Sequence, residues 1–295
     1  METSPLVSII TPTFNRAVYL PHAVDSVLGQ TYPHFEHWIV DDGSTDETAD
    51  VVNPYLADFR IRYVRQDNKG QSHARNRALK LSKGQFICFL DSDDCWFPHK
   101  LERSLEEFRA HPWAHVVYGD YQFIDAEGKP LPIKNMPRFS GRIVPWMLRD
   151  NCVSMNTTMA RRECFEQLGG FSGKRRFADD YDLWLRFSAY FRFLYLPEIL
   201  GCYRIMESQL STNKLERIKA NEEIIMDFLK NHGHRVTAQE KRMGLCRFYT
   251  RKGRILATQG QHASALGIYV KAIGHAPTDR APWRALAKLL IRGTG

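Results

Sequence analysis

The sequence lacks any apolar run of about 18 residues, the length that a membrane-spanning helix needs. Its first residues show no basic stretch followed by an apolar one, so no secretory signal peptide is visible. Its six cysteines form no CxxC pair and no regular spacing, which argues against a disulfide framework, and Cys88 is expected to be a reduced thiol in the core. Together these absences predict a cytoplasmic protein.

Two nucleotide-binding signatures are also missing. A dinucleotide-dependent oxidoreductase should carry GxGxxG after its first strand, but this chain has TPTFNR at 11–16. The same segment differs from the glycine-rich, basic first loop that nucleotidyltransferases usually carry. Both of these enzyme classes are therefore disfavoured.

The net charge of +8 is concentrated in the last third of the chain. Residues 1–205 carry 25 Lys and Arg against 26 Asp and Glu, whereas residues 206–295 carry 16 against 7. Such a basic tail suits nucleic acid, anionic lipid or an acidic partner. Nucleic acid is disfavoured because the tail aromatics have helical spacing and do not form a stacking platform.

The first hundred residues alternate between strand and helix periodicity. Apolar β-type runs are found at 7–10, 37–40, 62–64 and 86–90, and segments with helical spacing lie between them at 17–28, 46–56 and 72–81. Each unit takes roughly 25–30 residues, as βαβ crossovers do. This repeat predicts an α/β fold with an open, mainly parallel sheet and helices on both faces.

The rest of the chain is less regular and then helical. The pattern predicts a helix at 98–110, strands at 116–118 and 157–160, a loop at 130–150 and a helix at 179–187. From residue 215 the spacing is helical, and Thr237 to Glu240 fits a capping box. Residues 260–277 resemble the second helix of a tetratricopeptide repeat. Because one repeat cannot stack on itself, we expect a helical hairpin packed on the main domain.

Polar clusters follow three of the predicted strands, at 11–15, 41–44 and 91–94. Ligands of open α/β sheets bind at this edge. The alternative is that each cluster only forms a turn, and for Ser44 to Asp46 helix capping is favoured. The third contains Asp91, Asp93 and Asp94 directly after an apolar strand. Three adjacent carboxylates repel one another, so a cation is the natural compensation. A structural calcium site and simple helix capping are the alternatives.

The order of these segments resembles glycosyltransferase family 2, a group of inverting enzymes on the GT-A fold. The resemblance covers about residues 5–205 and rests on VSIITPTFNR at 7–16, WIVDDGSTDET at 38–48, NKGQSHARNRAL at 68–79, FICFLDSDDCWFPHKL at 86–101, LGGF at 168–171, DDYDLWLRF at 179–187 and YRIMESQLS at 203–211. It implies a GT-A (Rossmann-like) catalytic domain at residues 1–205 and a basic α-helical C-terminal extension at 206–295.

The resemblance also implies a nucleoside-diphosphate sugar donor, with UDP or dTDP favoured, and a divalent Mn²⁺ or Mg²⁺ ion. Asp93 would hold the metal, Asp91 would orient the ribose or complete the metal shell, and Asp94 is a further candidate ligand. Asp42 would accept from N3–H of the base. The implied nucleotide-sugar-binding set is Thr11, Pro12, Asn15, Asp42, Arg75, Asp91, Ser92 and Arg204.

Two arginines of that set have specific expected partners. Arg75 is expected to meet the diphosphate or the Asp42 carboxylate. Arg204 is expected to meet the diphosphate. Many relatives have a His shortly after this Tyr-Arg pair, but here Tyr203 and Arg204 are followed by Ile205 and Met206. A metal ligand from that loop is therefore in doubt.

Similar enzymes place the catalytic base in an acidic pair before a Tyr-Asp-Leu-Trp helix, which here is Asp179 and Asp180. The resemblance makes Asp180 the general base and lets Asp179 orient the base or the acceptor. The alternative is that both acids cap the helix, and for Asp182 this structural interpretation is preferred. Acceptor and sugar specificity are expected in residues 130–165.

The implied function is inverting transfer of a sugar to a hydroxyl of a glycan or lipid-linked acceptor in cell-surface polysaccharide synthesis. The alternative is a protein that binds nucleotide sugars without turnover, which would require a lost base or metal pair, and neither is missing.

The final segment adds a membrane hypothesis. Arg284, Lys288 and Arg292 fall on one face of a predicted helix that begins near Pro282. Apolar residues gather on the other face, except Ile291, and they are Trp283, Leu286, Leu289 and Leu290. Such a helix suits peripheral contact with the anionic inner face of the cell membrane. The alternative is that its apolar face packs on the preceding helical hairpin.

Overall fold

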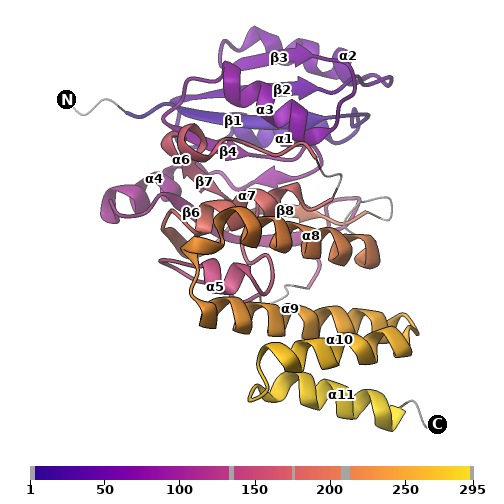
Figure 1. Cartoon of the computed structure of the whole chain (residues 1–295). Coiled ribbons are helices and arrows are strands. Elements are labelled where there is room, and N and C mark those ends of the chain that lie inside the picture. The colour runs from indigo at the N-terminus through magenta and orange to yellow at the C-terminus, as the bar shows by residue number, and fades with distance from the viewer. Residues whose placement is uncertain (1–3, 133–135, 175–176, 207–212, 293–295) are drawn as a thin grey trace.

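The computed structural model of the chain describes residues 4–132, 136–174, 177–206 and 213–292. It contains an eight-stranded mixed sheet in the order β3-β2-β1-β4-β7-β6-β8-β5. Helices cover both faces of this sheet, and a helical C-terminal region is stacked beyond β8, at the opposite end of the molecule from β3 (Figure 1). The predicted fold class is therefore confirmed.

The first half of the sheet is parallel. It consists of β1 (Val7–Thr13), β2 (Phe35–Asp41), β3 (Ile61–Arg65) and β4 (Phe86–Phe89), with β1 between β2 and β4. Every residue of β1 and of β4 is buried, as expected for short apolar runs covered on both sides. The carboxyl ends of β1, β2 and β4 consequently meet at one edge.

The second half mixes strand directions. β7 (Met159–Arg161) runs antiparallel to β4 and to β6 (Val116–Ile124), whereas β6 and β8 (Phe193–Arg204) are parallel, and β5 (Cys95–Trp96) pairs antiparallel with β8. The sequence analysis assigns no strand to β5 or β8. In β8, Pro197 falls where the register with β6 shifts, and such an irregularity interrupts the expected alternation.

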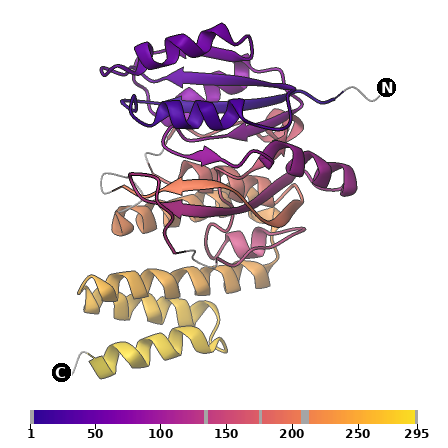
Figure 2. The ribbon, with the colours of Figure 1, turned by 180° about the vertical axis from the view of Figure 1, so that it is seen from behind.

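Helices flank the sheet on both sides. α1 (Leu20–Leu28) and α4 (Lys100–Ala110) share one apolar cluster with the strands, on the face that Figure 2 shows. α3 (Gln71–Leu81), α6 (Arg162–Leu168) and α7 (Asp179–Ser188) share another cluster on the opposite face. Apolar strands that alternate along the chain with amphipathic helices produce this layering.

Two local predictions need correction. The helix predicted at 46–56 is a short α2 (Thr48–Val52) followed by the 3-10 helix η1 (Asn53–Ala57), because Pro54 cannot supply the amide of a continuing α-helix. The loop predicted at 130–150 contains a single-turn helix, α5 (Val144–Met147). The six cysteines are free thiols and Cys88 is fully buried, as expected.

The C-terminal region contains α8 (Lys214–His232), the 3-10 helix η3 (Gly233–Arg235), α9 (Ala238–Thr258), α10 (His262–His275) and α11 (Arg280–Arg292). The Thr237 capping box is present, and α9 and α10 form the predicted hairpin (Figure 1). Buried residues of α8 and α9 belong to the same apolar cluster as α7. Among the described helices, none is long and apolar enough to cross a membrane.

Candidate active site

The acidic motif lies just beyond the buried strand β4. Asp94 is buried, and its Oδ1 accepts from the backbone N–H of Arg204 at 2.8 Å. Its Oδ2 is buried with no hydrogen-bond partner among the described residues. Burial, together with Asp93 and Asp91, raises the pKa of Asp94 well above its usual range. Burial and then Asp91 raise the pKa of Asp93 as well.

This crowding of carboxylates fits a divalent cation. Arg16 offers only weak compensation, since its Nε lies 3.7 Å from Oδ2 of Asp93. In the described part of the chain, no three His, Cys, Asp or Glu side chains are grouped so that they alone could hold a metal. An ion held by one or two carboxylates and the phosphates of a substrate needs no such group. The residues therefore fit a metal bound together with a diphosphate.

Arg75 joins the two acidic motifs. Its guanidinium donates from Nη2 to Asp91 Oδ1 at 2.5 Å and from Nη1 to Asp179 Oδ2 at 2.7 Å. The side chain is buried, which by itself lowers the pKa of Arg75, but the two carboxylates raise it overall. The expected contact between Arg75 and Asp42 is not formed, because Arg75 projects from α3 toward α7 and β4.

Asp179 is held by α3 at the first residue of α7. Its carboxylate accepts from Ser72 Oγ at 2.9 Å and from Gln71 Nε2 at 3.1 Å, in addition to Arg75. The preceding Ala178 is left-handed, with φ 57°. A non-glycine residue in that conformation is strained, so the surrounding contacts must fix the entry into α7. Asp179 is thus an organising group with its oxygens already occupied.

Asp180 has a different environment from its neighbour. It is half-buried, and Oδ2 accepts from Nδ2 of Asn151 at 2.8 Å. Burial and then the charge of Asp179 raise the pKa of Asp180 to about 6, against the opposing effect of Arg217 and Arg75. A carboxylate with a pKa near neutrality suits proton transfer.

Asp182 behaves as the structural interpretation predicts. It lies 3.2 Å from Nε of Arg186, one helical turn further along α7. Such a pair stabilises the helix modestly, so Asp182 has a structural partner within α7.

Asp42 sits in a cradle of donors from the loop after β3. Gln66 Nε2 and the Lys69 N–H donate to its Oδ1 at 2.7 and 2.9 Å, and the Gly70 N–H donates to Oδ2 at 2.7 Å. Gly70 has φ 89°, a conformation that favours glycine. The carboxylate is therefore held in one orientation directly after β2.

The predicted polar cluster at 11–15 is less open than expected, since Thr11 and Pro12 lie within β1 itself. Thr11 is fully buried, and its Oγ1 lies 2.8 Å from Nε2 of His37, so the hydroxyl already has a partner. Pro12 is buried as well. Asn15 ties two loops together, because its Oδ1 accepts from the Thr45 N–H at 2.8 Å. In the described structure these residues shape the edge of the sheet.

Arg204 and Ser92 are also buried. The Arg204 guanidinium donates from Nε to the Asp93 carbonyl at 2.8 Å and from Nη1 to the carbonyls of Asp125 and Ala126. These bonds support the loop that carries Asp93, so a direct contact with the diphosphate stays a prediction. The end of the last motif, residues 207–211, lies outside the described residues.

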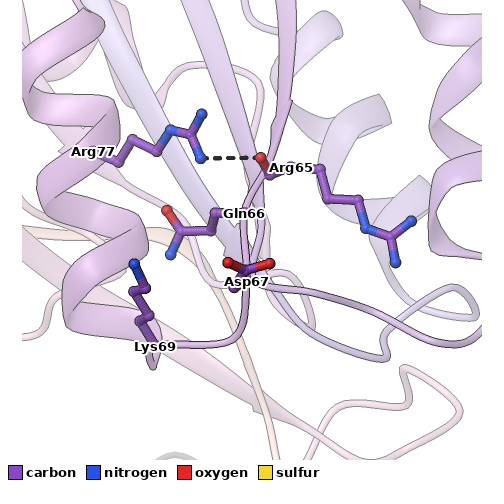
Figure 3. Close-up of a pocket in the computed structure, with 5 residues that line it drawn as sticks. All are labelled: Arg65, Gln66, Asp67, Lys69 and Arg77. Atoms are coloured by element: carbon purple, nitrogen blue, oxygen red, sulfur yellow. Dashed lines mark hydrogen bonds between the residues drawn. The ribbon is translucent and has the colours of Figure 1, made fainter.

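A cavity of about 490 Å³ opens beside the Asp42 cradle. Figure 3 shows Gln66, Lys69 and Arg77 on one side of the loop and the Arg65 side chain extending the other way. Arg77 Nη1 donates to the Arg65 carbonyl at 3.0 Å. Gln66 and Lys69 hold Asp42 and also line this cavity. The cavity therefore adjoins the place predicted for the nucleoside base, and its lining contains no residue of the acidic motif.

Sequence reasoning did not single out several residues that complete the site. They are the side chains that donate to or pair with the predicted carboxylates, namely Arg16, Gln66, Gln71, Ser72 and Asn151. Four of these five lie within or next to the motif segments, and that position in the sequence could have marked them as site residues. Asn151 lies in none of them and required the fold to be found.

A parallel half-sheet with acidic motifs at its carboxyl edge is the arrangement of the GT-A fold. Solved structures agree on the fold. Residues 1–349 of S. aureus TarS in complex with UDP give a TM-score of 0.66 at 22% identity, covering 90% of this chain and 80% of that one. The mannosyltransferase PcManGT of Pyrobaculum calidifontis, in complex with GDP-Man and Mn²⁺, gives 0.58 at 18% identity, covering 98% and 88%.

The family model for glycosyl transferase family 2 matches residues 8–176, and the chain belongs to that family. TuaG of Bacillus subtilis, a glycosyltransferase assigned to teichuronic acid biosynthesis, is 36% identical over 222 residues, covering 73% of this chain and 85% of TuaG. An uncharacterized glycosyltransferase of Rickettsia bellii is 35% identical over 183 residues, covering 62% of this chain. That match spans only 26% of the Rickettsia protein.

Proposed function

We propose that the chain transfers a sugar from a UDP- or dTDP-sugar to a hydroxyl of a glycan or lipid-linked acceptor, with inversion, during synthesis of a cell-surface polysaccharide. The observation that carries this proposal is the Arg75 bridge, which connects Asp91 of the acidic motif with Asp179 of the α7 motif. One buried guanidinium thereby joins the expected donor side to the expected acceptor side. A protein that only bound nucleotide sugars would have no use for the second motif.

Asp180 is the proposed general base. Its Oδ takes the proton of the acceptor hydroxyl while the acceptor oxygen attacks the anomeric carbon from the face opposite the diphosphate. The bond between that carbon and the diphosphate oxygen breaks, and the nucleoside diphosphate leaves with the electron pair. Because the pKa of Asp180 is about 6, the carboxylate is mostly ionised at neutral pH and still basic enough to accept a proton.

Asp93 and Asp91 are the residues proposed to hold a divalent metal together with the donor diphosphate. When bound, Mn²⁺ or Mg²⁺ would stabilise negative charge on the leaving group. PcManGT, which shares the fold, was determined with Mn²⁺. Asp42, fixed by Gln66 and the 69–70 backbone, is proposed to accept from N3–H of uracil or thymine. TarS, which also shares the fold, binds UDP.

Calorimetry with UDP, dTDP and GDP tests the donor proposal. We expect UDP or dTDP to bind at least tenfold more tightly with Mn²⁺ than with a chelator, since metal bridging adds a strong electrostatic contact. Asp93→Ala should abolish this metal effect, whereas Asp182→Ala, which removes an acid paired with Arg186, should preserve it. Equal binding with chelator would overturn the metal proposal, and preference for GDP would overturn the base assignment.

We further propose a division of labour in which residues 1–205 perform transfer and residues 206–295 hold the protein against the inner face of the cell membrane. The structure divides the apolar residues of α11 into two sets. Leu286 and Leu289 pack against the cluster of Leu256, Ala265 and Tyr269. Trp283, Leu290 and Ile291 remain 49%, 56% and 74% exposed. Packing therefore uses only part of the apolar surface that the sequence shows.

Cations flank this exposed apolar surface. Arg280, Arg284 and Lys288 are exposed on α11. Arg280 and Arg284 also line a cavity of about 460 Å³ with Arg247, which pairs with Asp279 at 2.7 Å. An exposed Trp beside several arginines suits the boundary between anionic headgroups and acyl chains. The side chain of Arg292 lies outside the described residues.

A further inference from the structure

Asn151 lies against the proposed base although it belongs to no recognised motif. We propose that Asn151 is a positioning residue, which holds the Asp180 carboxylate in one orientation and favours its ionised form. The inference rests on the proposed function, because it requires Asp180 to be the base. It gives a role to the segment between α5 and β7, which the sequence analysis predicts only as a region of specificity.

The orientation of the Asn151 amide is determined by its two partners. Its Oδ1 accepts from the backbone N–H of Val153 at 3.1 Å, so the NH₂ group must point the other way. That group donates from Nδ2 to Asp180 Oδ2 at 2.8 Å. Among the described residues, no other side chain donates a hydrogen bond to Asp180. The Tyr181 backbone also hydrogen-bonds this carboxylate, so Asn151 is its side-chain donor within the described structure.

The C-terminal helices hold the segment that presents Asn151. Asp150 forms an ion pair with Arg251 of α9. Leu148 packs so closely on Gly244 of α9 that an added Cβ there would lie 2.6 Å from the Leu148 Cβ. Tyr181 of α7 donates from its hydroxyl to the Met147 carbonyl at 2.6 Å. The chain just before Asn151 is thus fixed from α9 on one side and α7 on the other.

Charged groups from three elements face Asp180, and they shift its pKa independently of Asn151. Asp179 on the same helix disfavours the ionised carboxylate, while Arg75 from α3 and Arg217 from α8 favour it. A hydrogen bond donated to the ionised form also favours ionisation. Loss of the Asn151 donor should therefore move the titration of Asp180 upward.

Carboxyl ¹³C NMR on the full chain labelled at aspartate measures this titration without any substrate. The Asp180 resonance is identified by its absence in Asp180→Asn. We expect Asn151→Ala to raise the midpoint by roughly 0.5–1 pH unit, as loss of one charge-assisted hydrogen bond predicts. Asn151→Asp should raise it further, because it replaces the donor with a second negative charge at nearly the same volume.

Gln122→Ala is the matched control. The Gln122 amide also fixes a loop, by donating to the Leu131 carbonyl at 2.6 Å, but it has no contact with Asp180. It should leave the midpoint unchanged, whereas a general loosening of the structure would affect both variants. UDP binding should stay within twofold of the parent in all variants, which verifies folding.

The outcomes separate the two proposals. If Asn151→Ala and Asn151→Asp both fold, bind UDP and titrate at the midpoint of the parent, Asn151 does not position the base and the inference is wrong. If Asp180→Asn turns over donor as fast as the parent, the proposed function of Asp180 fails, whatever the NMR titration shows.

Discussion

The sheet and the C-terminal helices use arginine in opposite ways. Arg75, at the centre of the site, is 2% exposed and shared by two carboxylates at 2.5 and 2.7 Å. Arg280 and Arg284 on α11 face solvent, close to a single acid that Arg247 already occupies. A buried, paired guanidinium fixes geometry and is insensitive to salt, whereas an exposed group contributes to a field that salt screens. Substituting an arginine should therefore disturb the geometry of the site in the first region and weaken a salt-dependent surface attraction in the second.

The largest effect is expected at the proposed base. Asp180→Asn should lower turnover by about 10²–10⁴, the range for loss of general-base catalysis, and leave UDP affinity within a few-fold. The measurement is the rate of UDP release with the donor that binds best. Asp182→Asn, in the same helix, should retain turnover, and a dead Asp182 variant beside an active Asp180 variant would reverse the assignment.

The same Asp180 variant should change the pH dependence of stability. A carboxyl whose folded pKa is raised to about 6 costs stability above that pH, and the cost disappears as pH falls below the ordinary value near 4. Asp180→Asn should therefore stabilise the fold by about 1–3 kcal/mol at pH 8 and by little at pH 4. Chemical denaturation at both pH values measures the difference.

The next effect tests the contrast between buried and exposed arginine directly. Arg75→Met should lower the free energy of unfolding by about 3–5 kcal/mol at neutral pH, because it leaves the buried Asp179 and the partly exposed Asp91 without their cation. Arg284→Met, the exposed counterpart, should stay within about 0.5 kcal/mol of the parent. Similar losses of unfolding free energy in both variants would show that the buried and the exposed arginine do not differ in this respect.

The smallest effect per residue is expected on α11, where the readout is membrane contact. Replacing Arg280, Arg284 and Lys288 with Gln should weaken flotation with anionic liposomes by roughly fivefold per cation at low salt, since each contributes about 1 kcal/mol near an anionic surface. The matched control replaces three exposed cations of the first half-sheet, Arg62, Lys80 and Lys83, with Gln. Equal weakening by both sets, or no flotation of the parent, would count against membrane contact by α11.

A comparison with a chain ending at Asp279 sharpens that test. Removing α11 also uncovers Leu256 and Tyr269, so the shortened chain reports packing and charge together. If both the shortened chain and the triple substitution lose flotation while turnover persists, α11 acts in location alone.

The parallel half of the fold was predictable because its signals are local. β1, β2, β3 and β4 each coincide with a short apolar run, and the helices between them show the 3.6-residue period. β8 and α5 were not found, because Pro197 disturbs the pattern of the one and a single turn gives no period for the other. Both depend on segments that are distant in the sequence: β8 pairs with β5 and β6, and α5 contacts α7 and α9.

The site shows the same limit. The carboxylates Asp42, Asp91 and Asp93 are visible in the sequence as strand-end clusters, but their hydrogen-bond partners are not. Arg75 was expected to meet the diphosphate or Asp42, yet it reaches Asp179, 104 residues away in sequence. Which oxygen meets which donor depends on how α3 and α7 pack, and no local pattern encodes that.

The pairing of β5 with β8 determines when the site can form during synthesis. The strands β1 to β4 can assemble once about ninety residues have left the ribosome, because their partners are near in sequence. β5, directly after the acidic motif, must wait for β8, about a hundred residues later, and the Arg204 N–H that binds Asp94 arrives at the end of that strand. A nascent chain therefore carries a cluster of unsupported carboxylates for much of its elongation. The acidic motif is early in the sequence and late in the folding order.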